Sequence, residues 1–387
     1  KMLEERPGPV HLEIPTNVLN YEYQKLKKNN LCIKKKKIKS SEKKINDVSN
    51  YLTHAKYPIL LLGGGARGCD EYILKIVEKL SPYVITTINA RGILGDHSMC
   101  IPASPTLKTV RKELKKADIV LAVGTEFGET DYDMYKDGNF PKLKKLIRVD
   151  INKNQLTKNI QPHLSIRSDA IYFFKKLSEI LLVKKHYKKS SLQTPQTAKI
   201  IRKLCLKEIE PKLKIPLNLI STISSNFPNA ILVGDSTQPI YAGNLYTNTA
   251  KQGKWFNSAT GYGTLGYAPP ASIGAKLAKP KKPVICIVGD GGLQFSLSEL
   301  ITASEEQVPV IFLIWNSFGY KEIKDFMVSE NVNPIGVDIK PPNLKIQAAA
   351  FNLLYYGLIN RNNLVKTLKK AIKKKKPSIL EIRENEY

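Results

Sequence analysis

The chain contains 387 residues, of which 42% are hydrophobic and 8% aromatic, and this length is enough for two globular domains of ordinary size. Its formal net charge of +27 is carried mainly by lysines in separate short runs, such as residues 34–37 and 373–376, without a recognised nucleic-acid-binding motif. The charge therefore predicts a solvated lysine-rich surface and no nucleic-acid partner, with polyanion binding as the lesser alternative. No apolar run approaches 18 residues, so no membrane span is predicted.

Residues 1–40 are predicted to form a linker, because turn signals at residues 7–9 and 14–15 precede a stretch rich in Lys and Asn. The opening residues have no apolar core and no cleavage site, so a signal peptide is not expected. The five cysteines are scattered and form no Cys-x-x-Cys pair, which argues against structural zinc and disulfides and favours a cytoplasmic protein.

Strands and helices are predicted to alternate across residues 41–183, with strands at 57–62, 83–88, 118–123 and 146–151 and a helix at 70–80. Such alternation favours an α/β domain with a doubly wound parallel sheet. The pattern Gly63-x-Gly65-x-x-Gly68 follows the first strand, as a dinucleotide fingerprint would. No acidic residue ends the next strand, so NAD is not expected and a structural turn is the favoured interpretation.

A second linker is predicted at residues 184–196, where Lys, Ser and Pro are frequent. Residues 197–387 are predicted to form a second α/β domain, with strands at 230–233, 284–288, 308–315 and 378–382. The predicted fold is therefore α/β, with two doubly wound parallel-sheet domains.

An acidic residue and two small polar residues end two consecutive strands of the second domain. Gly289-Asp290-Gly291 follows the strand at 283–288, and Asn316-Ser317 follows the strand at 308–315, with a crossover helix expected at 297–307. Ligands of parallel sheets bind beyond the carboxyl ends of the strands. Glycines let backbone amides approach phosphate, and a carboxylate with a further oxygen from Asn316 or Ser317 suits Mg2+. The sequence predicts a diphosphate held with Mg2+, while a helix N-cap is the alternative role for Asp290.

These two motifs together resemble the thiamine diphosphate signature, which is Gly-Asp-Gly followed by Asn-Asn. Two further segments are similar to acetolactate synthases and 2-oxo acid decarboxylases, namely RPGPVHLEIPTNV (6–18) and GYGTLGYAPPASIGAKLA (261–278). Two others are most similar to the 5-guanidino-2-oxopentanoate decarboxylase branch of that family, namely ADIVLAVGTEFGETDYD (117–133) and GDSTQPIYAGN (234–244). The resemblance covers nearly the whole chain, and five motifs in the same order make it specific.

The resemblance implies a metal site and a diphosphate site. Asp290 is expected to ligate Mg2+ together with the Gly319 carbonyl and with Ser317, which stands where the family has asparagine and has a shorter reach. The diphosphate is expected to contact the backbone amides of Gly291 and Gly292. It is also expected to contact three residues of the 234–244 segment, which are Ser236, Thr237 and Gln238.

The resemblance also implies the catalytic residues. Leu265 is expected to wedge under the cofactor and bend it, and the Gly263 carbonyl is expected to accept a hydrogen bond from the amino group of its pyrimidine. Tyr320 is expected to border the cofactor. Tyr320, Ile323 and Met327 are together expected to form a wall of the substrate site.

The family has a pyrimidine-binding domain that supplies a glutamate to the cofactor, and this sequence contains no match to it. The chain alone is therefore expected to bind cofactor weakly and to turn over poorly.

The family's active sites are shared between subunits, which implies a homo-oligomer of at least two subunits. The implied substrate is a small-molecule 2-oxo acid. Decarboxylation is the leading interpretation. The alternatives are an acetolactate synthase large subunit, which condenses two 2-oxo acids and often binds FAD, and a non-catalytic scaffold. FAD is the lesser alternative to a structural turn at Gly63.

Overall fold

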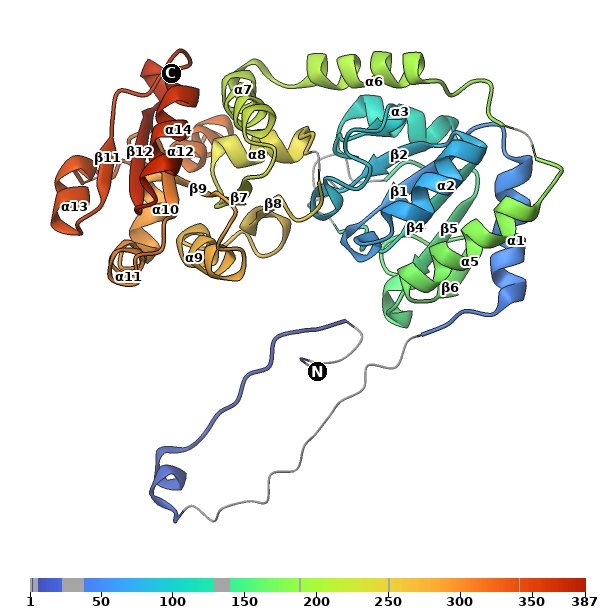
Figure 1. The fold of residues 1–387 in the computed structure, drawn as a ribbon, viewed down its shortest axis with the longest axis horizontal. Coiled ribbons are helices and arrows are strands. Elements are labelled where there is room, and N and C mark those ends of the chain that lie inside the picture. The colour runs from blue at the N-terminus through green and yellow to red at the C-terminus, as the bar shows by residue number, and fades with distance from the viewer. Residues whose placement is uncertain are drawn as a thin grey trace.

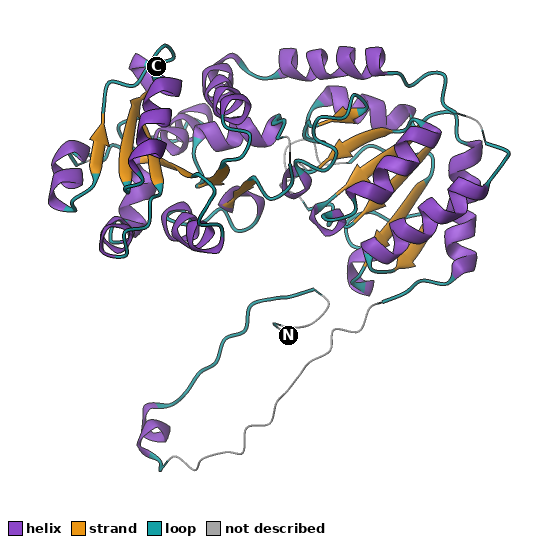
Figure 2. Cartoon of the chain, in the orientation of Figure 1, coloured by secondary structure: helices purple, strands orange, loops and turns teal. Residues whose placement is uncertain are grey.

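The computed structural model describes residues 2, 6–22, 38–128, 140–187, 189–249, 251–340 and 342–387. Outside these residues lie the lysine run 34–37, the end of the 117–133 segment, residue 188 of the predicted second linker and much of the predicted first linker. Figure 1 shows two α/β units, and Figure 2 shows that helices flank the strands of each unit. No helix of the described residues is both long and apolar enough to cross a membrane.

The first sheet has the strand order β3-β2-β1-β4-β5-β6, and its neighbouring strands pair in parallel. The central strand β1 (Pro58–Leu62) is an apolar run that is buried along its whole length, as expected where helices cover both faces of a parallel sheet. The other strands of this unit are β2 (Tyr83–Thr86), β3 (Cys100–Ile101), β4 (Ile119–Val123), β5 (Leu146–Asp150) and β6 (Leu164–Arg167). Its helices are α1 (Glu42–His54), α2 (Asp70–Leu80), α3 (Lys108–Lys116) and α5 (Ala170–Val183).

The second sheet has the order β11-β12-β10-β9-β7-β8, and again its neighbouring strands are parallel. Because β9 (Val284–Gly289) and β10 (Ile311–Asn316) pair in register, their carboxyl ends meet at one edge of the sheet. The other strands are β7 (Ile231–Gly234), β8 (Trp255–Asn257), β11 (Leu354–Tyr356) and β12 (Ser378–Arg383). The helices are α7 (Pro211–Asn226), α8 (Gln238–Leu245), α9 (Ala268–Ala278), α10 (Asp290–Leu293), α11 (Glu299–Glu305), α12 (Lys321–Ser329), α13 (Leu344–Ala350) and α14 (Leu364–Lys374).

The predicted α/β fold with two parallel-sheet units is confirmed. The predicted strands fall within a few residues of β1, β2, β4, β5, β7, β9, β10 and β12. Short 3₁₀ helices complete the described structure at Thr16–Asn20, Gly64–Ala66, Ile88–Ala90, Lys153–Leu156, Ser258–Thr260, Gln294–Ser296 and Glu384–Glu386.

A connecting helix, α6 (Pro195–Glu208), lies between the two units along the chain (Figure 1). It begins with a capping box between Thr194 and Thr197, and Pro195 stands at a position where its missing N–H is harmless. The buried side chains of α6 join the core of the first unit, and they are Ala198, Ile201 and Cys205. The segment predicted as a linker therefore runs directly into a helix that packs on the first unit.

The two units meet in close contacts around residues 244–249 and residue 251. The side chain of Arg91 is 2% exposed and donates to the backbone carbonyl of Asn244 at 3.0 Å. A Cβ atom on Gly92 would lie 2.3 Å from the carbonyl carbon of Lys251, so only glycine permits this approach. Such contacts hold the second sheet in a defined position relative to the first.

Candidate functional site

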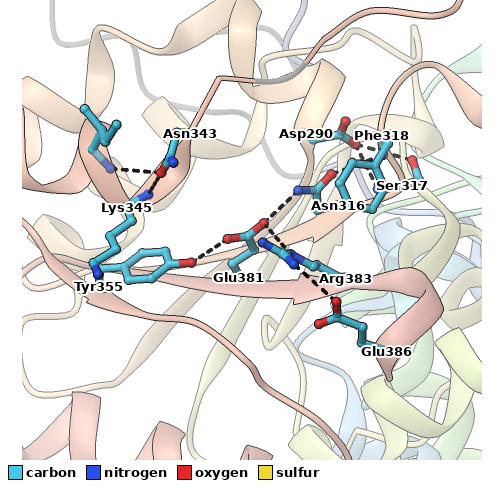
Figure 3. A network of polar contacts seen from close by, with 11 residues as sticks. Asp290, Asn316, Ser317, Phe318, Asn343, Lys345, Tyr355, Glu381, Arg383 and Glu386 are labelled. Atoms are coloured by element: carbon cyan, nitrogen blue, oxygen red, sulfur yellow. Dashed lines mark hydrogen bonds and ion pairs between the residues drawn. The ribbon is translucent and has the colours of Figure 1, made fainter.

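Three oxygen-bearing groups converge where β9 and β10 end. Asp290, the first residue of α10, is 1% exposed, and its carboxylate accepts the backbone N–H groups of Ser317 at 3.2 Å and Gly319 at 2.8 Å. The Ser317 hydroxyl lies 3.3 Å from an Asp290 carboxylate oxygen and 3.3 Å from the Gly319 carbonyl oxygen. Figure 3 shows Asp290 beside Ser317 above the end of the sheet. The structure thus brings together the three residues that were predicted to hold the metal.

The backbone of residues 317–319, called the metal loop below, makes this convergence possible. Phe318 has a φ angle of +62° and Gly319 one of +138°, so the chain turns sharply after β10. A Cβ atom on Gly319 would lie 2.8 Å from the carbonyl oxygen of Val337, which restricts this position to glycine. The turn points two backbone N–H groups at Asp290 and leaves the Gly319 carbonyl next to the Ser317 hydroxyl.

The chemistry of these groups fits a magnesium ion. Burial raises the pKa of Asp290, and hydrogen bonds from Ser317 and Gly319 oppose that rise. A cation beside a buried carboxylate favours its ionised form. Carboxylate, hydroxyl and carbonyl are all hard oxygen donors, which Mg2+ prefers. Among the described residues, no three His, Cys, Asp or Glu side chains cluster as a competing metal site.

Asn316 does not belong to this set of donors. Its Nδ2 donates to Glu381 at 2.7 Å, and its Oδ1 accepts the backbone N–H of Phe318 at 3.1 Å. The expectation that Asn316 could add an oxygen to the metal stays a prediction, and in this structure that oxygen is turned toward the backbone of its own loop.

The residues predicted to hold a diphosphate lie at the same edge of the sheet. A Cβ atom on Gly289 would lie 3.2 Å from Oγ1 of Thr237, so the loops after β7 and β9 touch. The hydroxyl of Ser236 donates to the carbonyl of Gly263 at 3.1 Å and lies 3.1 Å from the hydroxyl of Ser258. The turn that contains Gly263 is thereby tied to the end of β7.

Both ends of the Gln238 side chain already have a partner within the protein. Its Oε1 accepts the indole N–H of Trp315 at 3.1 Å, and its Nε2 donates to Glu322 at 2.5 Å. Gln238 is also the first residue of α8, where a backbone N–H has no partner within the helix. Its backbone N–H is therefore available for a contact to a diphosphate.

The remaining predicted cofactor residues pack around the two glycines of α10. A Cβ atom on Gly292 would lie 3.6 Å from Cδ2 of the half-buried Leu265, and one on Gly291 would lie 2.6 Å from Cε1 of Tyr320. Leu265 and Tyr320 thus border the surface of α10 on which Gly291 and Gly292 lie.

A cavity of about 450 Å³ opens between the two units next to this edge. It is lined from the first unit by Ile88 and Ser104 and from the second by Ser236, Tyr241 and Gly263, among others. The expectation that Ile323 and Met327 line the substrate stays a prediction, since both lie on α12, where Ile323 is 49% exposed and Met327 is half-buried.

Two buried carboxylates were missed by the reasoning from sequence. Asp235 is fully buried, and its carboxylate accepts the backbone N–H of Ser236 at 2.8 Å and of Ala268 at 3.1 Å, while burial raises its pKa. Its signal was present, because Asp235 follows an apolar strand just as Asp290 does. Glu381, inside β12, is 6% exposed, and a lone acid within the run Ser-Ile-Leu-Glu-Ile was also a readable signal.

The first unit has its own cavity of about 560 Å³ at the carboxyl ends of its strands, lined by Gly64, Gly65 and Asp150 among others. Gly63 and Gly65 have a reason in the packing of the backbone. A Cβ atom would lie 2.2 Å from the carbonyl oxygen of Gly124 in the first case and 2.8 Å from Gly124 Cα in the second. The crossing of the β1 and β4 loops thus requires these glycines whether or not a nucleotide binds.

Comparison with protein families gives two matches. The C-terminal TPP binding domain of thiamine pyrophosphate enzymes matches residues 235–382, and the central domain of thiamine pyrophosphate enzymes matches residues 45–177. Together these two matches cover more than half of the chain, and the first contains Asp290 and the metal loop.

Comparison with individual proteins gives relatives of the same kind. A probable 2-ketoarginine decarboxylase of Pseudomonas aeruginosa is 31% identical over 354 residues, which cover 90% of this chain and 61% of the relative. A probable acetolactate synthase large subunit of Methanococcus aeolicus is 28% identical over 341 residues, covering 81% of this chain and 56% of the relative. The acetolactate synthase isozyme 1 large subunit of Escherichia coli is 29% identical over 325 residues, covering 81% and 55%. The chain thus spans less than two thirds of the length of these relatives.

Proposed function

Because this chain belongs to the thiamine pyrophosphate enzyme family, we propose that it supplies the central and diphosphate-binding domains of an enzyme that removes CO2 from a 2-oxo acid. The proposed cofactors are thiamine diphosphate and Mg2+. The observation that carries the proposal is the convergence of the Asp290 carboxylate, the Ser317 hydroxyl and the Gly319 carbonyl at the ends of β9 and β10.

In the proposed site, the chain holds the metal and the diphosphate with different groups. Asp290, Ser317 and Gly319 would hold Mg2+ through their oxygens, which are the type of ligand that Mg2+ prefers. The diphosphate is held by the backbone amides of Gly291 and Gly292 and by the end of β7, which includes Ser236, Thr237 and Gln238. The short Ser317 side chain requires the metal loop to stay close to Asp290.

Thiamine diphosphate, when bound, supplies an electron sink for the loss of CO2 from a 2-oxo acid. The chain's own contribution is to orient and to exclude water. Leu265, which lies beside Gly292, would press against the cofactor and orient it, and the Gly263 carbonyl would accept a hydrogen bond from the amino group of its pyrimidine. Ser236 holds that carbonyl in place by donating to it. Fixing the reacting groups in this way removes the entropic cost of bringing them together.

The substrate class is proposed from chemistry and similarity. A small 2-oxo acid suits a cavity of about 450 Å³, and the similarity to a probable 2-ketoarginine decarboxylase favours a 2-oxo acid with a guanidinium end. We expect a cytoplasmic homo-oligomer of at least two subunits. Exposed apolar side chains suit burial by a second subunit, and they include Phe295, which is 64% exposed, and Phe326 on α12, which is 65% exposed.

The competing activity is that of an acetolactate synthase, which is favoured by the similarity to acetolactate synthase large subunits. That activity is often accompanied by FAD, which would occupy the cavity of the first unit. The packing of Gly63 and Gly65 against Gly124 accounts for these glycines without a flavin, so a structural turn stays the favoured interpretation there.

Product analysis separates these functions. The protein is incubated with thiamine diphosphate and Mg2+, and either pyruvate or 5-guanidino-2-oxopentanoate is added. Release of CO2 without a condensation product supports the decarboxylase. Formation of acetolactate by a protein that absorbs near 450 nm, as flavins do, supports the synthase. Because the chain alone is expected to turn over poorly, the CO2 released is compared with that from Asp290→Ala. Cofactor binding with no more CO2 release than Asp290→Ala contradicts both activities and supports the non-catalytic alternative.

A further inference from the structure

A buried carboxylate outside the proposed reaction lies close behind the metal loop. Glu381 lies on β12, with Tyr355 of the neighbouring strand β11 on one side and Asn316 of the neighbouring strand β10 on the other (Figure 3). Its Oε1 accepts the side-chain amide of Asn316 at 2.7 Å, and its Oε2 accepts the Tyr355 hydroxyl at 2.5 Å. Arg383 lies 3.5 Å from the same Oε1. A buried charge is tolerated when it is paired in this way.

The register of the sheet sets these contacts. In the parallel pairing of β10 with β12, Glu381 lies opposite Ile314, and the next residue on the same face of β10 is Asn316. On the other side of β12, β11 brings in Tyr355, which lies opposite Ile379. Glu381 is therefore fixed between two strands that are joined only through β12.

The carboxylate determines which way the Asn316 amide points. A carboxylate only accepts hydrogen bonds, so the Nδ2 of Asn316 must face Glu381 and its Oδ1 must face the opposite way. That oxygen accepts the backbone N–H of Phe318 at 3.1 Å. A continuous chain of hydrogen bonds therefore runs from Tyr355 through Glu381 and Asn316 into the metal loop.

The metal loop needs such support because its backbone is unfavourable. Phe318 has a side chain and yet adopts a φ angle of +62°, a conformation that persists only where the surroundings enforce it. Its backbone N–H is the group that Asn316 holds. Release of that N–H would let the loop relax and move Ser317 and Gly319 away from Asp290.

We propose that Glu381 is a positioning residue for the metal site, which acts through Asn316 to hold the metal loop against Asp290. The proposal rests on the proposed function, because it concerns the affinity of that site for Mg2+. The support from Glu381 matters more in this chain than it would beside the usual asparagine. Ser317 reaches less far than the asparagine usual in the signature, so a small displacement of the loop removes its oxygen from the metal.

The test measures the Mg2+ concentration needed for half-maximal binding of thiamine diphosphate by the 387-residue chain, using calorimetry and no turnover. Glu381→Leu removes the acceptor of Asn316, and we expect the required Mg2+ concentration to rise about 10- to 100-fold, as for other residues that orient metal ligands. Glu381→Gln should stay close to wild type, because its carbonyl can accept from Asn316 while its amide donates to Tyr355.

The matched control is Tyr355→Phe. It removes the other hydrogen bond of the same carboxylate and leaves the bond to Asn316 intact, so it should lower the thermal stability but not the Mg2+ dependence. If Glu381→Leu and Tyr355→Phe lower stability equally and neither changes the Mg2+ dependence, Glu381 only stabilises the sheet and the inference is overturned.

Asn316→Ala provides a second variant if Glu381→Leu fails to fold, since it breaks the same chain at its other end and leaves Glu381 paired with Tyr355 and Arg383. It should raise the required Mg2+ concentration to a similar extent, and an unchanged value would overturn the inference. Wild type and Asp290→Ala separate the two levels of the argument. If wild type binds the cofactor without regard to Mg2+, the proposed function fails and this inference fails with it. If wild type needs Mg2+ and Asp290→Ala does not bind, but Glu381→Leu and Asn316→Ala need no more Mg2+ than wild type, the inference alone fails.

Discussion

The contact between Gly291 and Tyr320 gives a prediction that can be worked from distances. A Cβ atom on Gly291 would lie 2.6 Å from Cε1 and 2.8 Å from Cδ1 of the Tyr320 ring. Carbon atoms in favourable contact lie about 3.5–4.0 Å apart, so Gly291→Ala requires the ring to retreat by about 1 Å. The ring directly follows the metal loop, and its displacement would disturb the loop as well.

Overpacking of this kind typically costs about 1–3 kcal/mol of unfolding free energy. The better helix propensity of alanine opposes it by roughly 0.5–1 kcal/mol. The net expectation is a loss of roughly 0–2.5 kcal/mol, centred near 1 kcal/mol, which lowers the melting temperature by about 2–4 °C for each kcal/mol in a domain of this size. Weaker binding of thiamine diphosphate should accompany the loss.

Gly274→Ala is the matched control for this experiment. Gly274 lies on the exposed side of α9, and a Cβ atom there would meet nothing within 4 Å. The same substitution should therefore stabilise the protein by roughly 0.5–1 kcal/mol. Thermal and urea unfolding of both variants provide the comparison. A Gly291→Ala protein as stable as Gly274→Ala, with unchanged cofactor binding, would refute the assigned contact.

Two further predictions concern the buried thiols and the cofactor wedge. Burial raises the pKa of Cys69, Cys100 and Cys205 to about 12 and that of Cys286 well above its ordinary value, so only roughly 0.01% of a thiol with a pKa near 12 is ionised at pH 8. Iodoacetamide followed by peptide mass spectrometry should label these four thiols in urea and not in the native protein, and native labelling would contradict their burial. Leu265→Ala should lower kcat by about 100-fold while Mg2+-dependent cofactor binding changes little, because a misplaced reactant loses rate before affinity. An equal loss of binding and turnover would indicate that Leu265 only packs.

Much of the fold was predictable, because strands buried on both faces form continuous apolar runs. Pro58–Leu62 and Ile311–Asn316 are such runs, and both were predicted within a few residues of their observed ends. The missed strands are short and are the outermost strands of the two sheets, where no long apolar run is needed. They are β3, β6, β8 and β11.

The sequence predicted only those parts of the site that come from residues at the ends of consecutive strands. Asp290 and Ser317 end consecutive strands, so their proximity follows from the parallel crossover alone. The support behind them does not follow in this way. Glu381 reaches Asn316 only because β12 returns to pair with β10, and Gln238 reaches Glu322 only because the ends of β7 and β10 meet at one edge. Side-chain pairs that depend on strand order are not readable from local pattern.

The central claim is that the ends of two adjacent strands hold Mg2+ and, through it, the diphosphate of the cofactor. Calorimetric titration with thiamine diphosphate, with and without Mg2+, tests this claim most directly when wild type and Asp290→Ala are compared. The account predicts that wild type binds the cofactor only when Mg2+ is present and that Asp290→Ala does not bind it under either condition. Binding that ignores Mg2+, or that survives in Asp290→Ala at wild-type affinity, would contradict the account.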